Sequence, residues 1–261
     1  MSTQFILSLV SGICIGGVAG YLGTLMLSRK MSVVAGPLAH LSLPGAAIAI
    51  IYGWSLFVGV FPFVLLGVFL IWILERKTRL PMENLAAIIF AFGVGTALLI
   101  LPIDKAEAAL IGSINTISFF ETLVVVLVSL LVFYFTKNMY AKIMLINIHE
   151  DLAQSSGINI SFYNFLYLFN IGLIVSIGVY LVGGLITAAL IAIPAAIAKN
   201  ISIDLKTYKM WSVIAGMLST VIGLLLNYFY HLPTGPLIIF VGFCLFVLIV
   251  FIKIIIQQKN K

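Results

Sequence analysis

Apolar residues fill this chain in long runs that are separated by short segments of charged and turn-forming residues. Runs of about 17–25 apolar residues are long enough to cross a hydrocarbon core of roughly 30 Å as helices. The sequence contains nine such runs, of which the seventh is short, so eight crossings remain an alternative to nine. The pattern predicts an all-α polytopic membrane protein, with residues 1–261 forming a single transmembrane domain. The expected spans are about 5–27, 32–52, 56–74, 84–102, 119–136, 163–183, 185–198, 210–229 and 236–256.

Composition and charge agree with this pattern and also predict an orientation. The chain is 63% hydrophobic and 8% charged, with a mean hydropathy of +1.25. If the N-terminus lies outside, thirteen of the 14 basic residues fall in inner segments and only Lys105 lies outside. The positive-inside rule therefore predicts an outer N-terminus and a cytoplasmic C-terminus. The net charge of +6 is then a topology signal, and we expect contact with lipid and no nucleic-acid partner.

No segment of the chain is long and polar enough to form a soluble domain. The longest polar stretch, residues 137–161, still contains the apolar segment KIMLINI. A GxxxxGK pattern followed by Ser or Thr is absent, so any ATPase that drives transport must be another polypeptide. An intramembrane enzyme is disfavoured because HExxH, GxSxG and paired aspartates within the spans are missing. A stand-alone carrier is disfavoured because acids that could couple protons or sodium are nearly absent from the spans.

One histidine stands out within the second span. From Met31 to Leu74 the only readily ionisable side chain is His40, and such a side chain is costly at membrane depth. Proline and glycine residues flank this histidine on both sides. Because both residue types weaken helices, we expect His40 to lie on a short irregular segment with free backbone carbonyls. The alternative is a packed histidine satisfied by one backbone hydrogen bond. The flanking residues are Gly36, Pro37, Pro44 and Gly45.

Two further segments have glycine and proline patterns typical of helix packing or helix breaks. Gly12, Gly16 and Gly20 recur every four residues, which predicts close helix packing within the subunit. The seventh span begins at Gly183 and Gly184 and contains Pro194. Broken helices of this kind are common beside transport pathways.

Acidic residues gather in one predicted outer segment. Asp104 and Glu107 precede the fifth span, and Glu121 lies near its start. A cation arriving from outside would meet these carboxylates first. The alternatives are an ordinary solvated loop for Asp104 and Glu107, and a favourable helix-dipole position for Glu121.

Four segments together resemble the permease subunits of ABC transporters for zinc, manganese and iron. In that family a segment G-D-A-L-S-H-x-x-L-P-G is followed by F-D-x-E-x-A-x-x-x-G, by V-G-x-L-L-V-x-A-L-L-V-I-P-A-A-x-A, and by L-P-x-G. The order and spacing match from about residue 12 to residue 250. The corresponding segments here are RKMSVVAGPLAHLSLPGAAIA, INIHEDLAQSSGI, VGGLITAALIAIPAAIAK and YFYHLPTGPLIIF.

The resemblance implies a fold, a substrate and partners. It implies a type II ABC importer-like permease in the cytoplasmic membrane of a prokaryote, which works as a homodimer or as a pair of related permeases. An extracytoplasmic binding protein would deliver a divalent metal ion as substrate, and two cytoplasmic ATPases would drive its import. No permanently bound cofactor is implied. Zinc, manganese and ferrous iron accept overlapping ligands, so the metal stays open.

The resemblance also implies roles for single residues. His40 matches the family histidine that is expected to face the pathway and contact metal. Gly36 replaces the family aspartate four residues earlier, and Pro37 replaces the alanine that follows it. An Asp and a His at that spacing share one helix face, so the site here is less anionic and binds a free ion more weakly. Either Glu121 supplies the missing charge, or the substrate is a metal chelate or another small cofactor.

Two inner segments, residues 137–162 and 199–209, are the predicted contacts with the ATPase. In the first, His149 and Asp151 occupy the positions of the family Asp and Glu, with Glu150 between them. A helix of the permease that rests in a cleft of the ATPase would transmit its closure. The alternative for both segments is a solvated connector. The coupling candidates in the second segment are Lys199, Asp204 and Lys206.

Overall fold

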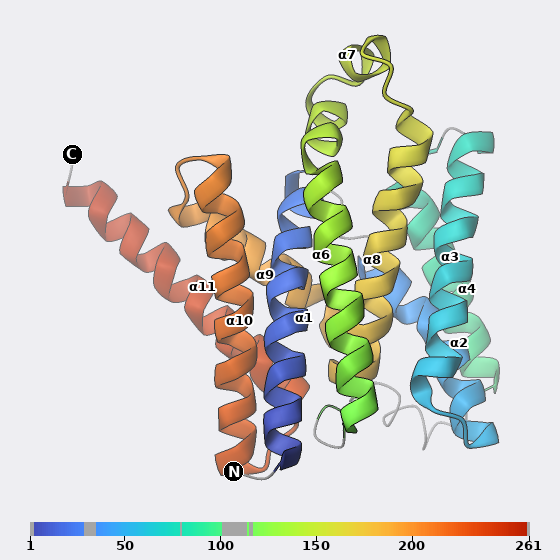
Figure 1. The fold of residues 1–261 in the computed structure, drawn as a ribbon, viewed down its shortest axis with the longest axis vertical. Helices are drawn as coiled ribbons and strands as arrows, with labels where there is room; N and C mark the ends of the chain where they lie inside the picture. The colour runs from blue at the N-terminus through green and yellow to red at the C-terminus, as the bar shows by residue number, and fades with distance from the viewer. Residues whose placement is uncertain (1–2, 29–34, 79, 101–113, 115–116, 260–261) are drawn as a thin grey trace. The chain divides into compact units, whose positions relative to one another are not determined.

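The computed structural model describes residues 3–28, 35–78, 80–100, 114 and 117–259, and every regular element in these ranges is helical (Figure 1). Eight of the helices are long and apolar enough to span a membrane, and the apolar stretch Thr187–Ile201 is shorter. The prediction of an all-α polytopic protein is therefore confirmed, with eight full-length spans and a short seventh segment. The helices are α1 (Thr3–Ser28), α2 (Ala35–Tyr52), α3 (Leu56–Thr78), α4 (Met82–Ile100), α6 (Phe119–Ile148), α7 (Glu150–Ser155), α8 (Ile160–Val182), α9 (Gly184–Ile201), α10 (Leu205–Tyr230) and α11 (Thr234–Lys259).

The chain divides into two compact units. The first comprises Met1–Leu27, Ile114–Leu130 and Ala189–Lys261, and the second comprises Ser28–Ser113 and Leu131–Ala188. Helices α6 and α9 each pass from one unit into the other. We describe each unit by itself.

In the first unit, α1 packs closely against α10 through the predicted glycines. A Cβ atom on Gly16 would meet the Gly216 carbonyl, and one on Gly20 would meet the Ser212 carbonyl. The Ser212 hydroxyl donates a hydrogen bond of 2.6 Å to the Gly20 carbonyl. Small residues thus allow the two backbones to touch, as expected for helices that associate in lipid.

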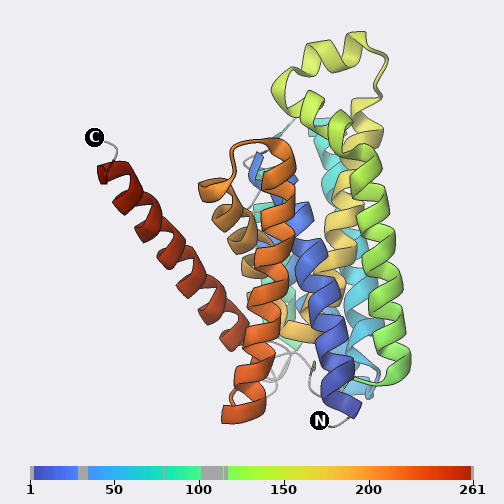
Figure 2. The same ribbon diagram turned by 60° about the vertical axis from the view of Figure 1, so that its left-hand side comes forward.

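Helix α11 is the least buried of the eight candidate spans. It contacts α10 near its start, where a Cβ on Gly223 would meet Ile238. It then leads away from α10 toward its C-terminal end (Figure 2). Farther along, Lys253 Nζ donates a 3.2 Å hydrogen bond to Asn200 Oδ1 at the end of α9.

In the second unit, α2 packs against α3, α4 and α8. A Cβ on Gly45 would meet the Gly59 carbonyl, so α2 and α3 are in backbone contact. Likewise, a Cβ on Gly93 would come within 2.9 Å of the Leu41 Cα, so α4 also approaches α2 closely. Glycines therefore set the position of α2 among its neighbours.

Polar and aromatic side chains join the ends of α3, α6 and α8. The Trp72 indole donates a 3.1 Å hydrogen bond to the Ser161 carbonyl, and the Arg76 guanidinium lies 5.1 Å from the Trp72 ring centroid. On α6, Lys142 Nζ donates a 2.5 Å hydrogen bond to the Tyr163 hydroxyl. Aromatic and basic residues of this kind are typical of a membrane–water interface.

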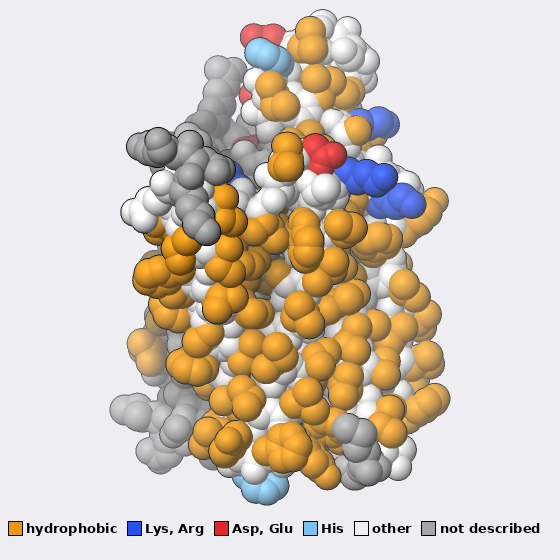
Figure 3. Space-filling view, turned by 90° about the vertical axis from the view of Figure 1, so that its left-hand side faces the viewer, with side chains coloured by type: hydrophobic (Ala, Val, Ile, Leu, Met, Phe, Trp, Pro, Cys, Tyr) orange, Lys and Arg blue, Asp and Glu red, His pale blue; other side chains and the backbone are white. Residues whose placement is uncertain are grey.

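Hydrophobic side chains cover the middle of the face drawn in Figure 3, and Lys, Arg, Asp and Glu side chains gather at one end of it. This distribution agrees with a membrane-spanning chain. The orientation, with the N-terminus outside, stays a prediction.

Candidate functional site: the histidine of α2

Helix α2 is continuous from Ala35 to Tyr52, so His40 lies in a regular helix and not on the irregular segment that the sequence suggested. Pro37 falls within the first four residues, where the backbone N–H has no intrahelical partner and its loss costs little. Pro44 is an interior proline. It removes one bond of the helix, the one that residue 44 would donate to the carbonyl four residues earlier. That carbonyl belongs to His40.

His40 lies on the more open face of α2. Gly36, His40 and Leu43 are partly exposed, whereas Leu38 and Leu41 are buried. Residues at i, i+4 and i+7 share one side of a helix, so the three partly exposed positions form one strip. This strip presents the imidazole of His40, and residue 44 has no N–H that could bond the carbonyl of the same residue.

A phenylalanine of α4 contacts the imidazole. The ring centroids of His40 and Phe90 are 5.0 Å apart, and the ring planes make an angle of 73°. This is the edge arrangement that aromatic rings prefer over a face-to-face sandwich. Phe90 lies three residues before Gly93, the residue through which α4 approaches α2.

The start of α9 lies beside the N-terminal part of α2. A Cβ on Gly184 would be 3.5 Å from the Ala39 carbonyl oxygen, and one on Gly36 would be 3.8 Å from the Ala188 Cβ. The break between α8 and α9 falls at Gly183, which has a φ of 106°. That backbone region is open to glycine and strained for other residues. Gly183 and Gly184 thus allow the chain to turn directly next to the histidine helix.

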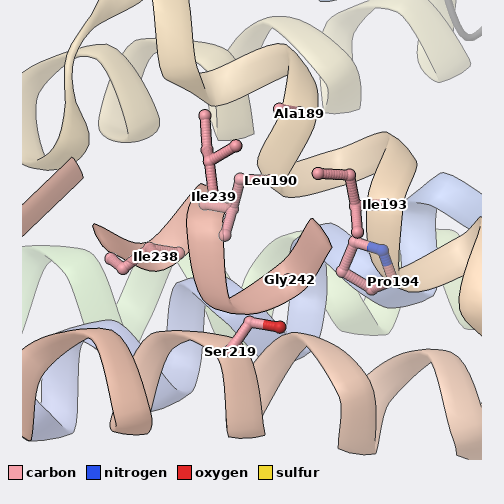
Figure 4. Close-up of a pocket in the computed structure, with 8 residues that line it drawn as sticks. All are labelled: Ala189, Leu190, Ile193, Pro194, Ser219, Ile238, Ile239 and Gly242. Atoms are coloured by element: carbon pink, nitrogen blue, oxygen red, sulfur yellow. The ribbon is translucent and has the colours of Figure 1, made fainter. Parts of the chain in front are cut away.

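Pro194, the other interior proline, lies in the first unit. It lines a small pocket between α9, α10 and α11, whose only side-chain hydroxyl is that of Ser219 (Figure 4). That hydroxyl donates a 2.8 Å hydrogen bond to the Ala215 carbonyl. The pocket is otherwise apolar. Its other lining residues are Ala189, Leu190, Ile193, Ile238, Ile239 and Gly242.

Glu121 caps its own helix. Its carboxylate accepts a 2.7 Å hydrogen bond from the Ser118 backbone N–H, and the Ser118 hydroxyl accepts one of 3.3 Å from the Glu121 N–H. This reciprocal pair is a capping box at the start of α6. These bonds agree with the helix-terminal interpretation of this carboxylate, and a role of Glu121 in the substrate pathway stays a prediction. Asp104 and Glu107 lie outside the described residues.

The side chains around His40 do not form a protein-only metal centre. Among the described residues, no group of three or more His, Cys, Asp or Glu side chains is arranged to hold a metal ion. A transported ion needs weaker coordination than a resident one, because it must leave again. A single imidazole fills only one position in the coordination sphere of a metal ion.

The first predicted ATPase contact forms a short helix after α6. His149 is the N-cap residue of α7, and its side chain makes no capping hydrogen bond. Glu150 and Asp151 occupy the first turn, and all three residues are exposed. Exposed apolar side chains lie beside these polar ones, Ile148 at 64% and Leu152 at 53% of full exposure. The segment therefore offers a mixed apolar and charged surface.

The second predicted contact connects α9 with α10. Lys199, Asp204 and Lys206 are exposed, and Ile203 between them is fully exposed. Asp204 caps α10 through hydrogen bonds with the side chain and backbone of Thr207. These bonds favour the charged form and hold the pKa of Asp204 below its usual value. The connection is thus rigid at its Asp204 end and apolar at its centre.

Sequence reasoning missed Phe90 and Gly93. A phenylalanine and a glycine in an apolar helix carry no local signal of a functional contact. Their role follows from the packing of α4 on α2, which the sequence pattern does not determine.

Comparisons with known proteins give the family of such a chain. The sequence model of the ABC 3 transport family matches residues 2–253. The chain is 27% identical over 256 residues to the high-affinity zinc uptake system membrane protein ZnuB of Buchnera aphidicola subsp. Baizongia pistaciae, which covers 95% of this chain and 97% of that protein. It is 25% identical over 249 residues to the manganese import system permease protein ScaB of Streptococcus gordonii, with coverage of 94% and 90%.

A solved structure, PsaBC from Streptococcus pneumoniae in complex with Fab, has a similar fold. The match has a TM-score of 0.81 at 22% identity and covers 95% of this chain and 91% of that chain. The arrangement of helices is thus shared over nearly the whole length.

Proposed function

The chain belongs to the ABC 3 transport family, and on that premise we propose that it is the translocation subunit of an importer for a divalent metal ion. The resemblance noted in the four sequence segments is confirmed. The chain is a multi-pass membrane permease and not an enzyme, and ATP hydrolysis falls to a separate subunit. Its cargo would be zinc, manganese or ferrous iron, which accept overlapping ligands.

The observation that carries this proposal is the placement of His40. Its imidazole lies on the partly exposed strip of α2. Pro44 leaves the carbonyl of the same residue without its helical partner. We propose that the imidazole nitrogen contacts the passing cation and that this carbonyl oxygen is available to it. Relatives named for zinc uptake and manganese import support the same substrate class.

The proposed mechanism is alternating access driven from the cytoplasm. A loaded binding protein docks outside, closure of the ATPases on ATP opens the pathway, and the ion passes His40. The exposed segments at α7 and at Ile203 contact the ATPase and transmit its movement. A second copy of the permease completes the pathway, because a single imidazole leaves most of the coordination sphere of a metal ion unfilled.

A second candidate is a permease of the same class for a metal chelate or another small cofactor. The observation that favours it is Gly36, which leaves the face of His40 without a carboxylate. A chelated metal brings its own oxygen ligands and needs fewer from the protein. Uptake measured with and without chelator separates the two substrates.

The test uses the permease reconstituted in vesicles with its ATPase and binding protein. ATP-dependent uptake of Zn²⁺, Mn²⁺ and Fe²⁺ is compared between wild type and His40→Ala. We expect uptake of the cognate ion to fall by about tenfold or more, since losing even an indirect ligand contact costs about that much. The control is His231→Asn, at an exposed turn residue with a φ of 55° that Asn tolerates. Equal uptake by His40→Ala and wild type would contradict a role for His40 in the pathway.

A further inference from the structure

Among the described residues, the aromatic ring that contacts the His40 imidazole is that of Phe90. Their centroids are 5.0 Å apart at 73°, and both side chains are partly exposed. Among the described residues, no hydrogen bond to the imidazole orients it. Histidines that bind metals are normally oriented by a hydrogen bond from the second ring nitrogen to a carboxylate or carbonyl. Here the ring contact with Phe90 takes that place.

The close approach of the α4 and α2 backbones positions this contact. Gly93 lets α4 approach the Leu41 Cα, where an added Cβ would be only 2.9 Å away. Leu41 follows His40 directly, and Phe90 is one helical turn before Gly93, on the same side of α4. The close approach at Gly93 therefore sets how near Phe90 comes to His40.

The chemistry of the pair favours a metal-bound imidazole. An imidazole that donates its lone pair to a cation becomes electron-poor, and the face of an aromatic ring attracts electron-poor groups, so the attraction requires the imidazole edge to meet the Phe90 face. The Phe90 ring also shields one side of the imidazole from other partners. A fixed ring loses less rotational freedom when the ion arrives, so the ion binds more tightly.

We infer that Phe90 is a positioning residue of the transport pathway, which orients the His40 imidazole toward the passing divalent metal ion. The inference rests on the proposed function, because it gives Phe90 a role only where His40 binds the ion. It adds a positioning contact from α4 that makes no bond to the metal.

The test measures metal binding to the permease–ATPase complex in nanodiscs without the binding protein. Zn²⁺ and Mn²⁺ are titrated separately, and the component of binding that disappears in His40→Ala is the His40-dependent binding. We expect Phe90→Leu to raise the dissociation constant of this component about fivefold, within the range for aromatic ring pairs. Phe90→Tyr keeps the ring and is expected to restore wild-type binding.

Phe92→Leu is the matched control. Phe92 lies two residues away on the same helix and is 65% exposed. Phe92→Leu therefore makes the same chemical change as Phe90→Leu, but at a position away from His40. If Phe90→Leu and Phe92→Leu bind metal equally well while the His40-dependent component persists, the inference is overturned. If His40→Ala removes no binding component at all, the proposed role of His40 in metal transport is contradicted, independently of Phe90. Thermal unfolding of each variant shows whether the fold is intact.

Discussion

Helices α2 and α9 share a backbone feature, an interior proline, but the residues around the two prolines differ. Each is 18 residues long and has a single interior proline. In α2, Pro44 lacks the N–H that would bond the carbonyl of His40, the residue whose imidazole contacts the Phe90 ring. In α9, Pro194 lacks the N–H that would bond the carbonyl of Leu190, and both residues line a pocket that is almost wholly apolar.

The difference shows that a proline inside a membrane helix does not by itself make a site. An interior proline costs a helix about 3 kcal/mol, whichever side chain precedes it. The carbonyl that loses its bond belongs to the residue four positions before the proline. The side chain of that residue decides whether a second polar group lies near the carbonyl. We therefore expect ion contact at α2 and a packing role for the proline of α9.

The largest expected effect comes from disturbing how each helix is seated. Gly93→Val would push α4 away from Leu41 of α2. Gly23→Val would push α1 away from the Ile191 carbonyl of α9. Overpacking of this kind costs about 1–3 kcal/mol. Both substitutions separate packed helices, so we expect both variants to unfold at lower temperature in detergent. Only Gly93→Val should weaken His40-dependent metal binding, because it displaces Phe90.

Gly95→Val is the control for this pair, since a Cβ on Gly95 meets nothing within 4 Å. It should match wild type in both measurements. If Gly23→Val weakened metal binding as much as Gly93→Val, the proposed separation of roles between α2 and α9 would be wrong.

An intermediate effect is expected from adding an acid to the strip of His40. Gly36→Asp places a carboxylate one turn before the imidazole, and the nearest atom to the new Cβ is the Ala188 Cβ at 3.8 Å. The hard oxygen should lower the Mn²⁺ dissociation constant about tenfold, which equals about 1.4 kcal/mol. The gain for Zn²⁺ should be smaller, because zinc depends less on carboxylate ligands.

Gly36→Asn is the matched variant, with the same shape and no charge. Titration of both variants with Mn²⁺ separates charge from shape. Equal affinities for Asp and Asn would show that residue 36 does not face the bound ion.

The sequence was enough to predict the elements whose signals are local. Long apolar runs predicted the spans, and the short seventh run corresponds to the short apolar stretch Thr187–Ile201. The sequence also placed Glu121 at a helix start, and the hydrogen bonds between Ser118 and Glu121 form a capping box there.

Two features could not be read in this way. The irregular segment expected around His40 is a regular helix, because Pro37 lies in the first turn and Pro44 removes a single hydrogen bond. The contact of Phe90 with His40 depends on the close approach at Gly93, which joins residues about fifty positions apart. Nothing in the local pattern of either helix encodes that distance.

The smallest expected effect comes from removing each proline. Pro44→Ala gives α2 an N–H that can bond the His40 carbonyl, and Pro194→Ala does the same for Leu190. Both variants should be at least as stable as wild type in thermal unfolding. Only Pro44→Ala should raise the dissociation constant of His40-dependent metal binding, by about threefold or ~0.7 kcal/mol, because it occupies an oxygen that the ion would use. An unchanged constant in Pro44→Ala would mean that the imidazole alone contacts the ion, and that both prolines act only on helix shape.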